Sequence, residues 1–337
     1  MDLFSKFKDN IIFLPIKSQL KIKYLSYGNV FLKVSYNMSD SFICNSYSKD
    51  FVYSDISNSK RIIGNITIIL DDNLYACRYD KSTYVEGIIL TKSHPMYKEN
   101  VSNVFFETDN EFIHIFHYPN EYITIMKKDK NEFLAIVSNE QDAIAQLLFS
   151  IKKLISKYNY YNNIFSLHCA AVKKDGQALL FLGGSYSGKT TLFLNLICNG
   201  YEPINDDVAY WKFENGKILV SGLPSCFNIR KHPEELIMSE GYWVHYDNLK
   251  FNNAYSDNVF EYSEVHTIYV PEFGYEKTEI NEKLNVDRKR ILRACAVHSD
   301  VFPTNDFLIA FNGLLSCRFK KINMSSDYNE VVQCIIG

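Results

Sequence analysis

The chain has 337 residues, 47% of them hydrophobic, which is enough for two packed cores because domains usually hold about 100–200 residues. Its formal net charge of −3, from 36 basic and 39 acidic residues, provides no overall positive field, so we expect no nucleic-acid partner. The amino-terminus has no basic segment followed by an apolar run, and no later stretch reaches about 18 uninterrupted apolar residues, so we expect a cytoplasmic protein with no membrane partner.

The amino-terminal part alternates short β-branched and aromatic runs with turn residues from residue 10 to about residue 137, for example in Asn65–Leu70 and Phe112–Phe116. This pattern is typical of short β-strands. We therefore predict a β-rich domain over residues 1–137, for which recognition of an acceptor is one candidate role.

The hydrophobic period then changes from that of strands to that of a helix. Ser138 and Gln141 have the spacing of a capping box. Apolar residues follow at helical spacing, namely Ile144, Leu147, Leu148, Ile151, Leu154 and Ile155. We predict a helix here and a domain boundary near Ser138, so that residues 138–337 form a second domain.

A hairpin is predicted after this helix. Asp175 and Gly176 stand between two apolar runs, which is the strongest short hairpin signal. If these two residues form the loop, paired residue numbers add up to 351, and His168 faces Gly183. The register therefore predicts an imidazole beside the glycine-rich segment that follows, although a purely structural histidine is an equal alternative.

That segment matches the Walker A pattern Gly-x-x-x-x-Gly-Lys-[Ser/Thr] in full. It comprises Gly183, Gly184, Ser185, Tyr186, Ser187, Gly188, Lys189 and Thr190. Glycines let backbone N–H groups curl around phosphates, and a lysine ammonium neutralises the outer phosphates. We predict that this segment and Thr191 bind ATP, and that Thr190 ligates Mg²⁺.

The surroundings of the motif agree with a phosphate-binding loop. An apolar strand precedes it, and residues 190–199 have the composition of a helix that Gly200 would end at its C′ position. Six residues beyond Gly200 stand Asp206 and Asp207. One carboxylate could bind Mg²⁺ while the other accepts the proton of an attacking hydroxyl. Neighbouring side chains of a strand point to opposite faces, so both can serve one site only where the backbone bends.

Two basic features lie further along the chain. Arg230, in the segment Ser221–Arg230, is a candidate for binding a phosphate or a carboxylate, with a surface salt bridge as the alternative. The cluster Arg288-Lys289-Arg290 with Arg293 falls on a predicted helix and could bind an acidic peptide, with a solvated face as the alternative.

In combination, His168, the hairpin, the glycine loop, the helix before Gly200 and Asp206-Asp207 resemble the catalytic domain of HPr kinase/phosphorylase. The chain looks nearer to the HPr-kinase-like kinases associated with ribosomally synthesised peptides. The resemblance covers roughly residues 160–230 and implies an α/β P-loop domain of the phosphoenolpyruvate-carboxykinase type, with a mixed sheet. Its typical acceptor is a serine hydroxyl of a protein or peptide.

Carried over by position, the resemblance implies that Lys189 and Thr190 hold the phosphates and magnesium. It implies that Asp206 and Asp207 share metal binding and proton abstraction, and that His168 supports them. The sequence departs from the family at Thr191, where an acidic residue is common, and has no counterpart of the glycine- and arginine-rich signature after the aspartates. We therefore expect neither HPr as the acceptor nor phosphorylase activity.

Three functions are compatible with these residues. The first is an ATP-dependent kinase acting on a Ser/Thr hydroxyl of a peptide or small protein, in a chain that could form a homo-oligomer. The second is a nucleotide-gated ATPase or regulatory binding module without phosphotransfer, and the third is a small-molecule kinase. The aspartate pair favours a kinase, because a switch ATPase needs a water-positioning group or an arginine finger that the sequence does not identify.

Overall fold

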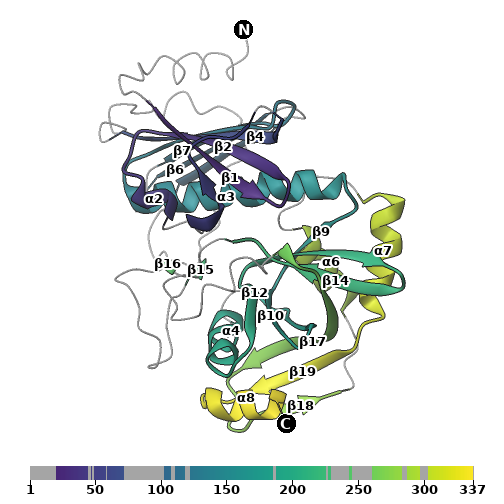
Figure 1. The fold of residues 1–337 in the computed structure, drawn as a ribbon. Coiled ribbons are helices and arrows are strands. Elements are labelled where there is room, and N and C mark those ends of the chain that lie inside the picture. Colours follow the sequence, from purple (N-terminus) through teal and green to yellow (C-terminus); the bar gives the residue numbers. More distant parts are fainter. Residues whose placement is uncertain are drawn as a thin grey trace. The chain divides into compact units, whose positions relative to one another are not determined.

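The structure is a computed structural model. It describes residues 20–44, 47, 49–57, 59–71, 102–107, 111–117, 122–184, 187–224, 227–228, 243–244, 260–282, 287–296 and 303–336. The chain divides into two compact units, the first made of residues 1–43 and 52–150 and the second of residues 44–51 and 151–337. Figure 1 shows the ribbon of both.

The first unit contains one eight-stranded sheet with the strand order β3-β1-β2-β4-β8-β7-β6-β5. Its central pairs β2–β4 and β4–β8 are parallel, whereas the other pairs are antiparallel. The strands are β1 Lys21–Tyr27, β2 Val30–Tyr36, β3 Val52–Tyr53, β4 Arg61–Leu70, β5 Ser102–Glu107, β6 Glu111–His117, β7 Tyr122–Lys127 and β8 Glu132–Val137. The short helix α2 spans Ser41–Cys44. The predicted β-rich amino-terminal part is confirmed.

Helix α3, Glu140–Tyr160, belongs to the first unit up to Ser150 and to the second from Ile151. Within the first unit it is joined to the sheet by a buried hydrogen bond of 2.7 Å from Thr124 Oγ1 to Gln146 Oε1. The predicted boundary near Ser138 remains a prediction.

The amino-terminal cap of α3 lies one residue later than the sequence predicted. Asn139 Oδ1 accepts a hydrogen bond of 2.9 Å from the backbone N–H of Asp142, and Asp142 Oδ2 accepts one of 2.8 Å from Asn139 Nδ2. Asn139 is thus the cap that was expected of Ser138, and asparagine caps a helix at least as well as serine. Asp142 differs from a capping-box residue because it accepts from the side chain of Asn139 and not from its backbone N–H.

The second unit contains a nine-stranded sheet with the order β12-β10-β11-β17-β14-β13-β9, extended by β19 beside β17 and β18 beside β19. Its strands are β9 Phe165–His168, β10 Ala170–Lys174, β11 Gln177–Phe181, β12 Glu202–Asn205, β13 Val208–Glu214, β14 Lys217–Ser221, β17 Ser263–Phe273, β18 Glu279–Asn281 and β19 Phe319–Met324. The pairs β11–β17 and β17–β19 are parallel, so the sheet is mixed. A separate pair joins β15 (Phe227–Asn228) to β16 (Trp243–Val244).

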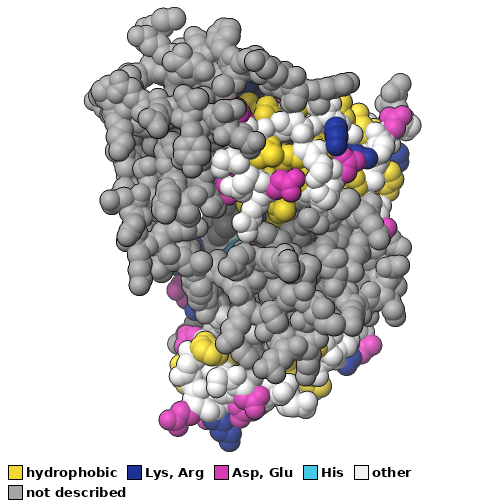
Figure 2. All heavy atoms as spheres, turned by 90° about the vertical axis from the view of Figure 1, so that its left-hand side faces the viewer, with side chains coloured by type: hydrophobic (Ala, Val, Ile, Leu, Met, Phe, Trp, Pro, Cys, Tyr) yellow, Lys and Arg dark blue, Asp and Glu magenta, His cyan; other side chains and the backbone are white. Residues whose placement is uncertain are grey.

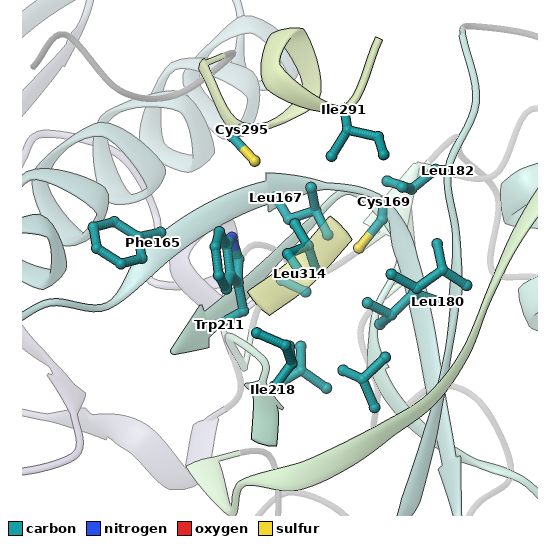
Figure 3. Packing of buried hydrophobic residues seen from close by; sticks show 14 of the residues in the cluster. Phe165, Leu167, Cys169, Leu180, Leu182, Trp211, Ile218, Ile291, Cys295 and Leu314 are labelled. Carbon is teal, nitrogen blue, oxygen red and sulfur yellow. The ribbon is translucent and has the colours of Figure 1, made fainter. Parts of the chain in front are cut away.

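Alternate residues of β10 and β11 point into two different cores. Val172 and Phe181 face a cluster with α4 (Lys189–Cys198) and α8 (Tyr328–Ile336). Ala171 and Leu180 face the cluster that holds Trp211 and the buried side chains of α6 (Arg288–Ala296) and α7 (Asn305–Leu315). Figure 3 shows the second cluster. Helices therefore cover both faces of the sheet, which is the layered arrangement of α/β proteins.

The predicted α/β class is confirmed: the chain has a β-rich amino-terminal part, followed in sequence by a unit with a mixed sheet. On the described part of the face in Figure 2, acidic and basic side chains are interspersed. Among the described residues, no helix has both the length and the apolar character needed to cross a membrane.

Candidate functional site

The glycine loop joins the end of β11 to the start of α4. The backbone N–H of Leu182 donates to Tyr269 O at 2.8 Å, which keeps the chain on the sheet up to Gly183. Gly188, with φ 85°, is the N-cap of α4 and contributes no side-chain cap. The first N–H groups of the helix are thus left for another acceptor, and helix amino-termini of this kind bind anions. Ser185 and Tyr186 lie outside the described residues.

Gly183 occupies a position with no room for a side chain. A Cβ there would lie 2.2 Å from Ser187 Oγ and 2.9 Å from Ser187 Cβ. At Gly184 a Cβ would meet nothing within 4 Å. The close approach of the two ends of the loop therefore requires glycine at the first of these positions but not at the second.

Lys189 folds back over the loop. Its ammonium donates to the carbonyl oxygens of Gly183 at 2.8 Å and Gly184 at 2.9 Å, and the residue is buried. Burial lowers the pKa of this lysine, while the nearby carboxylates, Asp207 foremost, act in the opposite direction. The ammonium is held at the loop by two carbonyl groups, which phosphate oxygens could replace.

The backbone bends at the aspartate pair. β12 ends at Asn205 and β13 starts at Val208, and the side-chain oxygen of Asn205 accepts hydrogen bonds from the N–H groups of Asp207 (3.1 Å) and Val208 (3.0 Å). Asn205 Nδ2 in turn donates to Leu223 O at 3.1 Å. This Asx-type turn takes Asp206 and Asp207 out of the alternation of a regular strand. The bend that a shared site requires is therefore present.

The two aspartates differ in their surroundings. Asp206 is buried, whereas the Asp207 side chain is 36% exposed. Asp207 Oδ1 lies 3.1 Å from His168 Nδ1, and Asp207 Oδ2 accepts a hydrogen bond from the ammonium of Lys152. Both carboxylates act electrostatically on Lys189. The structure thus places His168 in contact with Asp207 and both aspartates within electrostatic range of Lys189.

The predicted pairing of His168 with Gly183 is wrong, although the hairpin register behind it is right. Lys174 faces Gln177 and Ala170 faces Phe181, and Asp175 and Gly176 both have positive φ, as expected. The strand breaks at Cys169, however, and β9 pairs with β13, so that His168 faces Val208. His168 therefore reaches the site through the strand that follows Asp207.

Cys169, at this break, does not provide a nucleophile. It is fully buried, and burial raises the pKa of its thiol to about 12. A thiol with such a pKa stays protonated near neutral pH and is a poor nucleophile.

Thr190 and Thr191 lie in the first turn of α4, directly after Lys189. Mg²⁺ in nucleotide sites is held by one or two carboxylates together with substrate phosphates. Thr190, Asp206 and Asp207 offer oxygen donors of this kind. Within the described ranges there is no group of three or more His, Cys, Asp or Glu side chains that could hold a metal ion. The oxygen atoms of Thr190, Asp206 and Asp207 are compatible with magnesium carried by a nucleotide, and the N–H groups at the start of α4 are compatible with its phosphates.

Helix α6 lies beside the start of the loop. Ile291 is in one core cluster with Leu182 and Cys169, and Figure 3 shows these three side chains near one another. Further along the helix, Cys295 O accepts a hydrogen bond of 3.4 Å from Ser166 Oγ in β9. Arg290 is exposed, and its charge acts on Lys189. Arg230 lies outside the described residues.

Sequence reasoning missed two residues of this site, Lys152 and Asn205. The sequence does contain a signal for Lys152. This lysine lies four residues after Leu148 and three before Ile155, on the buried side of α3. A charge without a partner is rare in such a position, so a partner could have been expected. Asn205 directly precedes Asp206 and is a residue type that makes Asx turns. Both signals become specific only when the sheet pairing is known.

Comparisons with known proteins add little to this geometry. No protein-family model matches the chain, and no curated protein matches it significantly. The structure of the HPr(Ser) kinase/phosphatase from Coxiella burnetii is similar at 19% identity with a TM-score of 0.28, covering 51% of this chain and 93% of that one. A likeness as distant as this decides neither activity nor substrate.

Proposed function

We propose that this protein is an ATP-dependent kinase that transfers the γ-phosphoryl group to a serine or threonine hydroxyl of a peptide or small protein. The observation that carries the proposal is the position of the bent aspartate pair. Asp207 is bound by Lys152 and contacted by His168 Nδ1 at 3.1 Å, and both aspartates lie within electrostatic reach of the loop lysine, Lys189. A loop that binds phosphates and a carboxylate able to take a proton are the two parts that phosphoryl transfer to a hydroxyl requires.

Each residue has a proposed task. The N–H groups at the start of α4 and the Lys189 ammonium bind the outer phosphates, and Thr190 with one aspartate holds magnesium. Mg·ATP, when bound, supplies the phosphoryl group. The other aspartate accepts the proton of the acceptor hydroxyl while His168 orients it. The acceptor oxygen forms its bond to phosphorus as the bond to the ADP oxygen breaks, so the charge balance needs no further reactant.

The alternatives make different predictions about the acceptor. A nucleotide-gated ATPase would hydrolyse ATP without any acceptor, and a small-molecule kinase would leave peptides unlabelled. We favour the kinase because the aspartate pair provides a proton acceptor beside the loop. The choice of a peptide or protein acceptor rests on the resemblance of residues 160–230 to HPr-kinase-like proteins.

The test uses the full chain, γ-labelled Mg·ATP and two sets of acceptors. One is an array of Ser- and Thr-containing peptides, and the other consists of the small peptides encoded beside the gene. Transfer should depend on a peptide and should be lost in Lys189→Ala, which should remain folded by circular dichroism. Mass spectrometry then locates the phosphate. Hydrolysis without transfer to any peptide, or full turnover in folded Lys189→Ala, would contradict the proposal.

The two aspartates provide a second arm of this test. Substitution of the magnesium ligand by asparagine should weaken Mg·ATP binding, whereas substitution of the proton acceptor should leave affinity nearly unchanged and slow transfer by about 10²–10⁴-fold. Asp206→Asn and Asp207→Asn should therefore differ in the magnesium dependence of ATP binding. Full activity in both variants would remove the kinase and leave a nucleotide-binding protein.

A further inference from the structure

Lys152 is the part of the site that neither the glycine loop nor the aspartate motif accounts for. It lies on α3 with 8% of its surface exposed, and its ammonium donates a hydrogen bond to Asp207 Oδ2. Lysine is almost never buried to this extent without a partner, because removal of its charge from water is costly. The ion pair therefore explains why a lysine is tolerated on the buried side of this helix.

The stem of Lys152 is held in place by its helix. Ile151, Leu154 and Ile155 are at most 2% exposed, so this part of α3 is fixed in a core. The Lys152 side chain is itself only 10% exposed, so its stem has little room to follow a moving carboxylate. Helix α3, through Lys152, therefore restricts the position of the Asp207 carboxylate.

Asp207 is thereby held from three directions. Asn205 accepts the hydrogen bond from its backbone N–H, His168 Nδ1 lies 3.1 Å from Oδ1, and Lys152 binds Oδ2. Asp207 is nevertheless 36% exposed in its side chain, so a substrate can reach it. A carboxylate with one oxygen bound by an ammonium and the other in close contact with an imidazole nitrogen is restricted in its rotation, and such preorganisation is what a reacting group needs.

We propose that Lys152 is a positioning residue that fixes the orientation of the Asp207 carboxylate for phosphoryl transfer. The proposal rests on the kinase function and assigns to it a residue from outside the Walker and Asp-Asp motifs. Lys152 does not touch the substrate in this role. It acts through Asp207, which we take as the proton acceptor because His168 contacts it, so its loss should affect the transfer step more than nucleotide binding. An ion pair that only stabilises the fold would change neither of these quantities in a folded variant.

The test compares Lys152→Met with Lys152→Arg, which keeps the charge, and with Lys153→Met. Lys153 is the next residue of the same helix and is half-buried. The readouts are Mg·ATP affinity by calorimetry and the single-turnover rate of transfer to the peptide that the wild-type chain labels best. We expect Lys152→Met to keep affinity within about twofold and to slow transfer by about 10–100-fold, as loss of an orienting partner does elsewhere. Lys152→Arg should recover most of the rate, and Lys153→Met should match the wild type.

A double variant makes the test specific for Asp207. In an Asp207→Asn background, Lys152→Met should cause little further loss of rate, because the group it positions is already altered. Additive losses, or a wild-type rate in Lys152→Met, would overturn the proposal while the kinase function stands. A wild-type chain that labels no acceptor would remove the kinase function, and the role of Lys152 with it. Should Lys152→Met not fold, Lys152→Gln allows the same comparison, because it keeps a hydrogen-bond donor without the charge.

Discussion

The side-chain oxygen of Asn205 accepts the backbone N–H of Asp207 at 3.1 Å, and this contact fixes the bend between β12 and β13 in which Asp206 and Asp207 stand. Asn205 is buried, and its amide also donates to Leu223 O. Asn205→Ala removes all of these bonds and leaves polar backbone groups unpaired. Each such group costs about 1–3 kcal/mol, so we expect a clear loss of stability and a larger loss of phosphotransfer.

Asn199 provides the matched control for that variant. It also makes a hydrogen bond from its side chain to a carbonyl, 2.8 Å from Nδ2 to Asn195 O, but it is exposed at the end of α4. Asn199→Ala should therefore cost little stability and leave transfer unchanged. Urea unfolding and single-turnover assays measure both quantities. Equal effects in the two variants would mean that Asn205 has no special role in shaping the aspartate turn.

The two glycines at the start of the loop should respond differently to alanine. At Gly183 the new Cβ would lie 2.9 Å from Ser187 Cβ, which rotation of the serine side chain cannot relieve, whereas Gly184 has open space. Overpacking typically costs about 1–3 kcal/mol, so Gly183→Ala should weaken ATP binding by about ten- to a hundredfold. Gly184→Ala should bind ATP nearly as well as the wild type. Calorimetric titration with Mg·ATP decides this, and the opposite order would refute the loop geometry.

Features encoded over a few residues could be predicted from the sequence. The hairpin at Asp175-Gly176 and the helix end at Gly200 appear as expected, with positive φ at all three residues. Local chemistry determines these features, because glycine and asparagine or aspartate tolerate that conformation best. The helix predicted after the glycine-rich segment also appears, as α4.

The partners of His168 and Lys189 could not be predicted in the same way. The hairpin register was right as far as Ala170, but the chain breaks at Cys169 and β9 leaves for β13. Only the order of strands in the finished sheet reveals that His168 and Asp207 meet. Lys152 likewise comes from a helix more than fifty residues away in sequence from Asp207. Contacts of this range depend on tertiary packing rather than on any local pattern.

Asp142 should make the stability of the amino-terminal unit depend on pH. Burial raises the pKa of this aspartate from 3.8 to about 6, although the hydrogen bond from Asn139 acts against the rise. A raised pKa means that the folded state favours the protonated form. The stability contributed by Asp142 is therefore fully present below about pH 4 and is lost as the pH rises through about 6.

Replacement of Asp142 by asparagine removes the buried charge and can keep an acceptor for Asn139. We expect Asp142→Asn to raise the free energy of unfolding at pH 7 by about 1–2 kcal/mol and to flatten its pH dependence between about pH 4 and 6. Glu140→Gln, an exposed change in the same helical turn, should not alter the shape of that profile. Thermal unfolding followed from pH 4 to pH 8 measures both. A profile for Asp142→Asn that parallels the wild type would contradict the assignment.

Arg290 should assist nucleotide binding through its charge. It is exposed on α6, whose Ile291 packs in the same cluster as Leu182 at the entrance to the loop, and its charge contributes to lowering the pKa of Lys189. A cation near enough to act on that lysine also attracts the phosphates that the lysine binds. Arg290→Gln should therefore weaken Mg·ATP binding by about three- to tenfold at low ionic strength, and less at about 0.5 M salt because exposed charges are screened.

Arg293, three residues further along the same helix and also exposed, provides the control. Arg293→Gln should cause a smaller loss, because the field of an exposed charge falls with distance. Equal losses for the two variants would instead indicate a general effect of the basic helix, and the acidic-peptide interpretation of that helix could then be tested by competition with a poly-glutamate peptide.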